Sequence, residues 1–292
     1  MSIIDLHMHS TYSTDGEFTP EELIRRCLDK NLKVVSLTDH NSIKGVPKMI
    51  YLGQKRGIHV LSGIELDVTF KEVNLHLLGY GIAEDERYHE YEKIIAEQEI
   101  KASGFRMDMI RELGIPFSTE KVLELSRGGI VTSEMIGEAA IIEENKDHPL
   151  LLPYFPGGER SDNPYVNFHW DFCAQGKPAY VPIAYMSLSQ GISLILDTGG
   201  IPVLAHPGQN IGLNEALLKE IIQEGIHGIE AYSSYHNADT TAFYVKKAKE
   251  HNLLITAGSD FHGKTKPAIP IGAPVPSGED ERILESISTF FS

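Results

Sequence analysis

Short apolar runs that resemble β-strands alternate with amphipathic helical stretches along most of this chain, and this alternation is the strongest constraint on its fold. The strand-like runs begin at Ile3 and recur at residues 32–38, 58–66, 74–80, 179–181, 200–208, 228–232 and 253–262. Strand–helix–strand units with right-handed crossovers give a parallel sheet, and closing that sheet brings the strand ends to one rim. The sequence therefore predicts an α/β fold with a closed sheet.

Residues 85–176 interrupt this alternation. Helical spacing of apolar residues runs over 88–113 and 119–144 with no strand-like run between them, and a Pro- and Gly-rich loop follows. We interpret this segment as an inserted, mainly helical cap subdomain. The predicted division is a barrel domain of residues 1–84 and 177–292 and a cap of residues 85–176.

His, Asp and Glu residues recur at or near the ends of the predicted strands. In the first strand, His7 and His9 share one face because alternate residues of a strand point the same way, and Asp15 follows in the next loop. Imidazoles and carboxylates bind divalent transition metals, whereas a cluster without metal would leave several imidazoles unpaired. We therefore predict a metal centre. Its candidate ligands are His7, His9, Asp15, His40, Glu65, His76, His206, Asp260 and His262.

The chain is acidic and poor in cysteine. Its 41 acidic and 26 basic residues give a formal charge of −15, which argues against binding extended nucleic acid, although a local metal-rich pocket would still hold a phosphate. Two cysteines are too few for a disulfide framework. The sequence shows no signal-peptide pattern and no run of about 18 apolar residues, so we expect a cytoplasmic protein without membrane association.

These motifs resemble those of the PHP (polymerase and histidinol phosphatase) metallophosphoesterases, which belong to the wider group of amidohydrolase-like barrels. The matching motifs are Asp5–Ser10 with Asp15–Gly16, Thr38–His40, Gly63–Glu65, His76, Leu204–Pro207 and Gly258–His262. The resemblance covers about residues 1–82 and 178–265 and points to the TrpH-like branch, which includes nucleotide bisphosphate phosphatases. It implies a distorted seven-stranded, TIM-like (β/α) barrel that holds two or three divalent metal ions.

The resemblance also implies how the ligands are shared. The first ion takes His7, His9, Glu65 and Asp260, the second takes Glu65, His76 and His206, and the third takes Asp15, His40 and His262. Position 15 is histidine in some family members. The aspartate here favours Mn or Fe as much as Zn, because a carboxylate is a harder ligand than an imidazole.

Such a centre predicts hydrolysis of a phosphoester. Neighbouring divalent ions turn a bridging water into hydroxide at neutral pH and stabilise charge on the phosphoryl oxygens. We predict a phosphatase that acts on a phosphomonoester of a small phosphorylated metabolite or nucleotide, with a 3′,5′-bisphosphonucleotide among the options. The cap would close the barrel mouth against polymers.

Three other functions stay open. A 5′→3′ exonuclease on short RNA or DNA occurs in the same branch, but it would need a basic groove that bears aromatic residues. A non-catalytic metal-binding module is the second alternative, and the full ligand set argues against it. The third is a C–N amidohydrolase, whose lysine bridge between metals has no evident counterpart here, since Glu65 fits that position.

Further residues are candidates for substrate contacts and proton transfer. Asp39 precedes His40 and would either support an imidazole or serve as a structural strand-ending residue. His236 follows the strand 228–232 and would bind phosphate or protonate the leaving group. The candidates for holding a substrate phosphate are Arg127, Arg160, Lys177 and His236. Family members often carry an Arg-Pro-His stretch in the insertion, and residues 128–134 lack any basic side chain, which disfavours a bisphosphate.

The remaining histidines fall on predicted helices, at strand starts or in the insertion. We interpret them as residues that bind no metal. They are His59, His89, His148, His169, His227 and His251.

Overall fold

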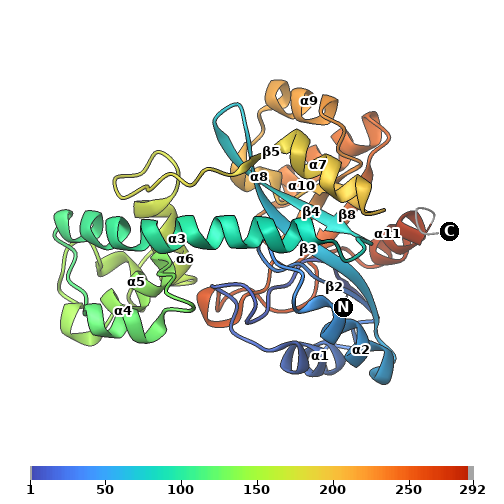
Figure 1. Cartoon of the computed structure of the whole chain (residues 1–292). Helices are drawn as coiled ribbons and strands as arrows, with labels where there is room; N and C mark the ends of the chain where they lie inside the picture. The colour runs from blue at the N-terminus through green and yellow to red at the C-terminus, as the bar shows by residue number, and fades with distance from the viewer. Residues whose placement is uncertain (1, 289–292) are drawn as a thin grey trace.

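Seven strands form one nearly closed sheet at the centre of the barrel domain (Figure 1). The computed structural model of the chain describes residues 2–288. The strands, in their order around the sheet, are β1 (Ile4–Asp5), β2 (Val34–Leu37), β3 (His59–Phe70), β4 (Val73–Tyr80), β6 (Ile201–Leu204), β7 (Gly228–Ser233) and β8 (Leu254–Gly258). The predicted α/β fold with a distorted seven-stranded barrel is confirmed.

The barrel closes where β1 meets the segment that follows β8. The Asp260 amide donates to the carbonyl of His7 at 2.9 Å. Beside this bond, the buried Asp5 carboxylate accepts the amide of Ser259 at 2.9 Å and its hydroxyl at 2.6 Å. Because Asp5 lies on β1 and Ser259 directly follows β8, these bonds hold the two ends of the sheet together.

The prediction of a parallel sheet is wrong for β4. This strand is antiparallel to β3 and to β6, because only Lys71 and Glu72, both with positive φ, join β3 to β4. So short a connection builds a hairpin, whereas a parallel crossover needs about a dozen residues. The length of β3 also places Glu65 within the strand rather than near its end, and Asp67 lies opposite His76 in the register.

The predicted strand at residues 179–181 does not form. Pro178 and Pro182 flank it, and proline lacks the amide that a sheet ladder requires. The chain instead returns to the barrel through β5 (Met186–Ser187), which pairs with β3 outside the main order of strands.

Amphipathic helices follow the strands and bury their apolar faces against the sheet (Figure 1). Helix α1 begins with a capping box, in which Thr19 and Glu22 each accept the other's amide. Helix α2 ends at Gly57, whose φ is 72°. The helices of the barrel domain are α1 (Pro20–Asp29), α2 (Val46–Arg56), α7 (Leu188–Asp197), α8 (Pro207–Asn210), α9 (Glu215–Gln223), α10 (Ala238–Glu250) and α11 (Glu279–Ser288), with the 3₁₀ turn η4 (Gly263–Thr265).

The segment between β4 and β5 is helical, as predicted, and extends to one side of the barrel (Figure 1). Its helices are α3 (Glu86–Glu112), α4 (Thr119–Leu125), α5 (Ser133–Ala140) and α6 (Pro164–Phe168), with the short turns η1 (Glu143–Asn145), η2 (Leu152–Tyr154) and the π-helical η3 (His169–Cys173). The predicted helical stretch 119–144 is broken between α4 and α5, where Gly128 and Gly129 have φ of 60° and 87°.

Helix α3 belongs to both parts of the molecule. Tyr88 and Ile95 in its first half pack into the barrel core. Ile110 near its end packs with Val122 and Phe168 in a separate apolar cluster of the insertion. The boundary at residue 85 therefore stays a prediction, since one continuous helix serves both cores. No helix within residues 2–288 is long and apolar enough to cross a bilayer.

Gly258 lies where β8 approaches β1 most closely. A Cβ atom there would lie 2.2 Å from the Cβ of His7 and 2.5 Å from Oε1 of Glu230. We expect Gly258→Ala to lower the free energy of unfolding by about 2 kcal/mol or more, because β1 must move away. Urea denaturation of the metal-free protein measures this loss.

Gly104→Ala is the matched control for this change. Gly104 lies in α3, and a Cβ there would meet nothing within 4 Å outside the helix's own backbone. This variant should raise the free energy of unfolding by about 0.5–1 kcal/mol, because alanine restricts the unfolded chain. Equal stability of the two variants would contradict the close approach of β8 to β1.

Candidate metal centre

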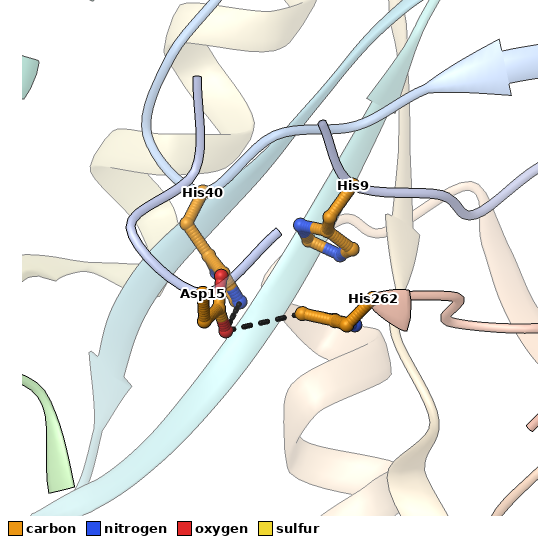
Figure 2. A group of neighbouring side chains, drawn as sticks. All are labelled: His9, Asp15, His40 and His262. Atoms are coloured by element: carbon orange, nitrogen blue, oxygen red, sulfur yellow. Dashed lines mark ion pairs between the residues drawn. The ribbon is translucent and has the colours of Figure 1, made fainter. Parts of the chain in front are cut away.

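The nine predicted ligands meet at one end of the barrel. His7, His9 and Asp15 follow β1, His40 follows β2, Glu65 and His76 lie in β3 and β4, His206 follows β6, and Asp260 and His262 follow β8. Figure 2 shows four of them, His9, Asp15, His40 and His262, turned toward one another. In this part of the cluster, Nε2 of His262 lies 3.1 Å from Oδ2 of Asp15.

The ligand atoms form four overlapping groups, in each of which all atoms lie within 4.8 Å of one another. The groups are His7, His9, Glu65 and Asp260; Glu65, His76 and His206; His9, Asp15, His40 and His262; and His40, Asp67 and His76. The first two groups are identical to two of the ligand sets implied by the family resemblance, and the third is the remaining set with His9 added. The structure thus brings each set together, while the assignment of sets to ions stays a prediction.

Seven buried ligand atoms in the cluster make no hydrogen bond within the described chain. They are Nε2 of His7, His9 and His262, Nδ1 of His40, and one carboxylate oxygen each of Asp15, Glu65 and Asp260. A buried polar atom without a partner costs about 1–3 kcal/mol, so seven of them in one place require an explanation. Divalent cations would satisfy all seven.

The separations between these atoms also suit a shared cation. Nε2 of His7 lies 3.2 Å from Oε2 of Glu65 and 3.3 Å from Oδ1 of Asp260. Metal–nitrogen and metal–oxygen bonds of about 2.1 Å place neighbouring ligand atoms roughly 3 Å apart. The residues present therefore fit divalent metal ions.

Two ligands are held in strained backbone conformations. His206 has φ of 21° and Asp260 has φ of 57°, in the left-handed region that favours glycine. Such residues cost about 1–3 kcal/mol each and persist only where the surrounding structure enforces them. Here the conformations turn both side chains into the cluster.

Glu230 supports the cluster and was missed by the sequence analysis. It is fully buried on β7, where it lies 2.9 Å from Nδ1 of His7 and accepts the backbone amide of His206 at 2.9 Å. Because Nδ1 of His7 donates its proton to this carboxylate, Nε2 is the nitrogen that faces the other ligands and that would bind a metal once its own proton is released. An acidic residue inside an apolar strand was the signal that could have identified it.

Burial and neighbouring charges set the protonation of the ligands. Burial alone would raise the pKa of Glu65, but His7 and His40 hold that pKa well below its usual value, so Glu65 is ionised. Burial and the nearby His262 lower the pKa of His9 to about 4. His9 is therefore a neutral imidazole at pH 7, which is the form that coordinates metals.

Asp67 is a further residue that the sequence analysis missed. Its carboxylate lies 3.4 Å from Nδ1 of His40 and 3.4 Å from Nε2 of His76. Asp67 follows Glu65 by two positions in β3, so the two carboxylates share one face of the strand. That spacing was visible in the sequence, but the predicted strand ended one residue before Asp67.

A cavity of about 680 Å³ opens above the cluster. One wall consists of metal-centre residues such as His40 and His206, and the opposite wall comes from the insertion, including Arg106, His169 and Trp170. His169 belongs to none of the four groups, although its Nδ1 lies 2.7 Å from the Ser133 hydroxyl at the cavity wall. Residues of the ligand cluster and residues of the insertion thus line the same cavity.

A family model matches the N-terminal part of the chain. The sequence profile described as PHP domain matches residues 5–124, which contain six of the nine predicted ligands. The chain contains a PHP domain. This finding confirms the resemblance inferred from the motifs.

Relatives with several activities share the full length of this PHP-domain chain. It is 29% identical to a 3′,5′-nucleoside bisphosphate phosphatase of Chromobacterium violaceum, over 97% of this chain and 99% of the relative. It is 27% identical to a phosphoribosyl 1,2-cyclic phosphate 1,2-diphosphodiesterase of Eggerthella lenta, over 94% and 100%. It is also 27% identical to the 5′-3′ exoribonuclease Rnm of Salmonella typhimurium, over 89% and 85%.

A solved structure has the same architecture. The structure of an amidohydrolase from Chromobacterium violaceum, described with bound SO4 and no metal, superposes with a TM-score of 0.74 at 25% identity. The match covers 98% of this chain and 97% of the other, so it includes the insertion as well as the PHP barrel.

The structure argues against the predicted roles of His236. Nε2 of His236 accepts the amide of Gly208 at 2.9 Å, and Nδ1 lies 2.9 Å from the carbonyl of Ala231. The ring stacks on Tyr244 and does not line the cavity. Both ring nitrogens serve the backbone, so neither is free to bind phosphate or to protonate a leaving group.

Asp39 has a structural role in the PHP barrel. Its carboxylate accepts the amide of Ser10 at 2.6 Å and the Ser10 hydroxyl at 2.8 Å, and the structure shows no contact with an imidazole. Burial raises the pKa of Asp39 to about 6. The second of the two predicted roles is the observed one, and a catalytic role has no support.

Of the three predicted phosphate-binding cations, only Lys177 lines the cavity. Arg160 is paired with Asp171 through two bonds of 2.8 Å. Arg127 donates from Nη1 to the carbonyls of Ser13 at 3.0 Å and Gly16 at 2.6 Å. Neither arginine lines the cavity, so the structure gives no support to the prediction that they hold a substrate phosphate.

We expect the metal-free PHP domain to gain stability when divalent ions bind. The unpartnered atoms of the cluster gain ligands in the folded state only, and a metal at 100 times its Kd stabilises by about 2.7 kcal/mol. The melting temperature of EDTA-treated protein should therefore rise by about 5 °C or more with Mn²⁺ or Zn²⁺. Elemental analysis should give at least two equivalents, and one or fewer would contradict a multinuclear centre. His59→Asn, outside all four groups, should respond like the wild type.

Arg127 reaches from the insertion to the loop that carries Asp15, so its removal should loosen that ligand. We expect Arg127→Ala to weaken the binding of one Mn²⁺ by about tenfold, as loss of outer-shell support does elsewhere. Calorimetric titration of the metal-free protein measures this change. Arg111→Ala is the control, since Arg111 bonds to Asp108 and Thr119 at the surface. Unchanged affinity in Arg127→Ala would show that Asp15 needs no such support.

Proposed function

We propose that this PHP-domain chain is a metal-dependent phosphoesterase that hydrolyses a phosphomonoester of a small phosphorylated metabolite or nucleotide. The observation that carries this proposal is the set of four overlapping ligand groups, whose residues line a cavity together with residues of the insertion. Full-length relatives named as a phosphatase and a phosphodiesterase support the same reaction class.

The residues of the cluster divide the work of binding and orientation. Divalent ions, when bound, supply a nucleophilic water of lowered pKa and neutralise charge on the phosphoryl oxygens. Glu65 belongs to two groups, so it would join two ions. Glu230 accepts from Nδ1 of His7 and so leaves Nε2 facing the other ligands, where it would bind a metal.

The donor set favours Mn, Fe or Zn, in two or three copies. Six of the ligands are imidazoles, which suit all three metals, and carboxylates such as Asp15 and Asp67 add hard oxygen donors. Oxygen donors at one end of the cluster favour Mn or Fe there. Zn suits the groups that are richer in histidine.

The cavity favours a compact substrate. Its volume of about 680 Å³ lies in the range of small-molecule sites. Its wall carries Glu92, Glu99 and Glu134, whereas Arg106 is already bonded to Glu99 and to a backbone carbonyl. A second phosphate would therefore meet few free cations, which favours a monophosphate over a bisphosphate or an oligonucleotide.

The exonuclease is the second candidate, because a 5′-3′ exoribonuclease is among the full-length relatives. It would need a cationic track beyond the cavity, and each uncompensated phosphate would contribute no counterion-release affinity. A non-catalytic metal module and a C–N amidohydrolase have less support, since all nine candidate ligands lie in the groups and Glu65, a member of two of them, would fill the bridging position.

Substrate comparison tests this proposal directly. We expect the Mn-loaded protein to have its highest kcat/KM on a mononucleotide or sugar monophosphate, a lower kcat/KM on a 3′,5′-bisphosphonucleotide, and the lowest on a 5′-phosphorylated oligomer of about five nucleotides. If the oligomer is the best substrate, the exonuclease replaces the phosphatase. Absence of turnover on all three would support the non-catalytic module.

Glu65→Gln should lower kcat/KM by a factor of about 1,000 or more, because it removes a shared ligand without changing the size of the side chain. Circular dichroism should show an intact fold. Glu124→Gln, an exposed glutamate of α4 near Lys121, is the control and should retain full activity. Retained activity in Glu65→Gln would mean that the ligand assignment is wrong.

A further inference from the structure

A buried lysine borders the metal centre without belonging to it. Lys266 directly follows η4 and lines the cavity, and its side chain is only 7% exposed. Its Nζ atom contacts Oδ2 of Asp260, while Oδ1 of Asp260 is the oxygen left without a hydrogen bond in the cluster. Lys266 thus lies directly behind a candidate metal ligand.

Tyr235 completes this edge of the cavity. It follows β7 and lines the cavity, and its ring centroid lies 5.3 Å from that of His206. The Nζ atom of Lys266 lies 5.0 Å from the same ring, and the Tyr235 hydroxyl interacts with both Lys266 and Asp260. An ammonium and a hydroxyl therefore lie together beside the strained ligands His206 and Asp260.

Asp260 by itself does not account for a buried ammonium. Burying a lysine costs several kcal/mol unless its charge and its three donors are compensated. Asp260 lies 3.3 Å from His7 and 3.1 Å from His9, and a bound divalent ion would compensate its charge without help from Lys266. With metal bound, the ammonium of Lys266 would therefore need another anion as its partner, and the cavity that Lys266 lines has room for one.

Other basic side chains near the cavity are less suited to this task. Arg106 is committed to Glu99 and the carbonyl of Val131, and Lys177 is exposed at the surface. Of the lysines and arginines that line the cavity in residues 2–288, Lys266 is the one that is buried and contacts a candidate ligand. It is not itself a member of the ligand groups.

We propose that Nζ of Lys266 binds a non-bridging oxygen of the substrate phosphoryl group, with the Tyr235 hydroxyl as a second donor. This inference rests on the proposed function and names the residues that receive the phosphoryl group. A fixed ammonium at this position stabilises the charge that the phosphoryl oxygens carry in the transition state. Lysine serves here as a point charge, so arginine should replace it in part.

The test uses the Mn-loaded, full-length protein with inorganic phosphate as the probe. We expect Lys266→Met to retain the metal equivalents of the wild type, to raise the Kd of phosphate at least about tenfold, and to lower kcat/KM on a phosphomonoester about 100-fold. Lys266→Arg should recover most of the phosphate affinity. Tyr235→Phe should give a smaller loss.

Lys48→Met is the matched control, because Lys48 forms an exposed ion pair with Glu21. It removes the same charge and should change neither phosphate binding nor turnover. An unchanged phosphate Kd in Lys266→Met would overturn the inference. Loss of metal in both Lys266→Met and Lys266→Arg would also overturn it, since Lys266 would then be a positioning residue for Asp260.

The two proposals fail in different ways. If the wild type hydrolyses no phosphomonoester but binds phosphate in a Lys266-dependent manner, the anion site stands and the phosphatase falls. If the wild type is active and Lys266→Met equals it, the phosphatase stands and the role of Lys266 falls.

Discussion

The junction between β1 and β8 is the contact on which the metal centre depends. Asp5 accepts two hydrogen bonds from Ser259, and the amide of Asp260 bonds to the carbonyl of His7. These bonds close the sheet and bring ligands from the two ends of the chain close enough together to bind the same metal ion. The absence of a side chain at Gly258 permits the same close approach. The bonds that close the barrel therefore also bring the ligands together, and a change in the backbone here would affect both.

Several features that destabilise the metal-free protein lie together in the ligand cluster. It combines unpartnered buried atoms, two ligands with positive φ, and carboxylates withdrawn from water. Each would destabilise the metal-free protein by about 1–3 kcal/mol, and a divalent ion removes most of that cost by coordination. Residues outside the ligand set make this possible, because Glu230 fixes His7, Arg127 holds the loop of Asp15, and Lys266 lies behind Asp260.

Two groups of residues line the cavity, the candidate metal ligands and the residues of the insertion. Relatives named as a bisphosphate phosphatase, a cyclic phosphodiesterase and an exoribonuclease align over nearly the whole of this chain. A fold shared among such activities does not identify the substrate, which depends on the groups that the insertion places above the metals. In this chain that wall bears Glu99 and Glu134, with Arg106 already neutralised, and so favours substrates of low charge.

The sequence by itself determined the fold class and the helical insertion, and it named the nine candidate ligands that the structure brings together, because strand ends and ligand types are local patterns. The sequence did not show that β4 is antiparallel, because the predicted strand 58–66 ended before β3 does. The same early end of the predicted strand left out Asp67. Glu230 lies far along the chain from His7, and Lys266 lies far from Tyr235, so only the tertiary structure could reveal these contacts. His236 and Arg127 were misjudged for the same reason. His236 was placed at the rim because it follows a barrel strand, but the hydrogen bonds of both side chains are to backbone atoms that folding brings near.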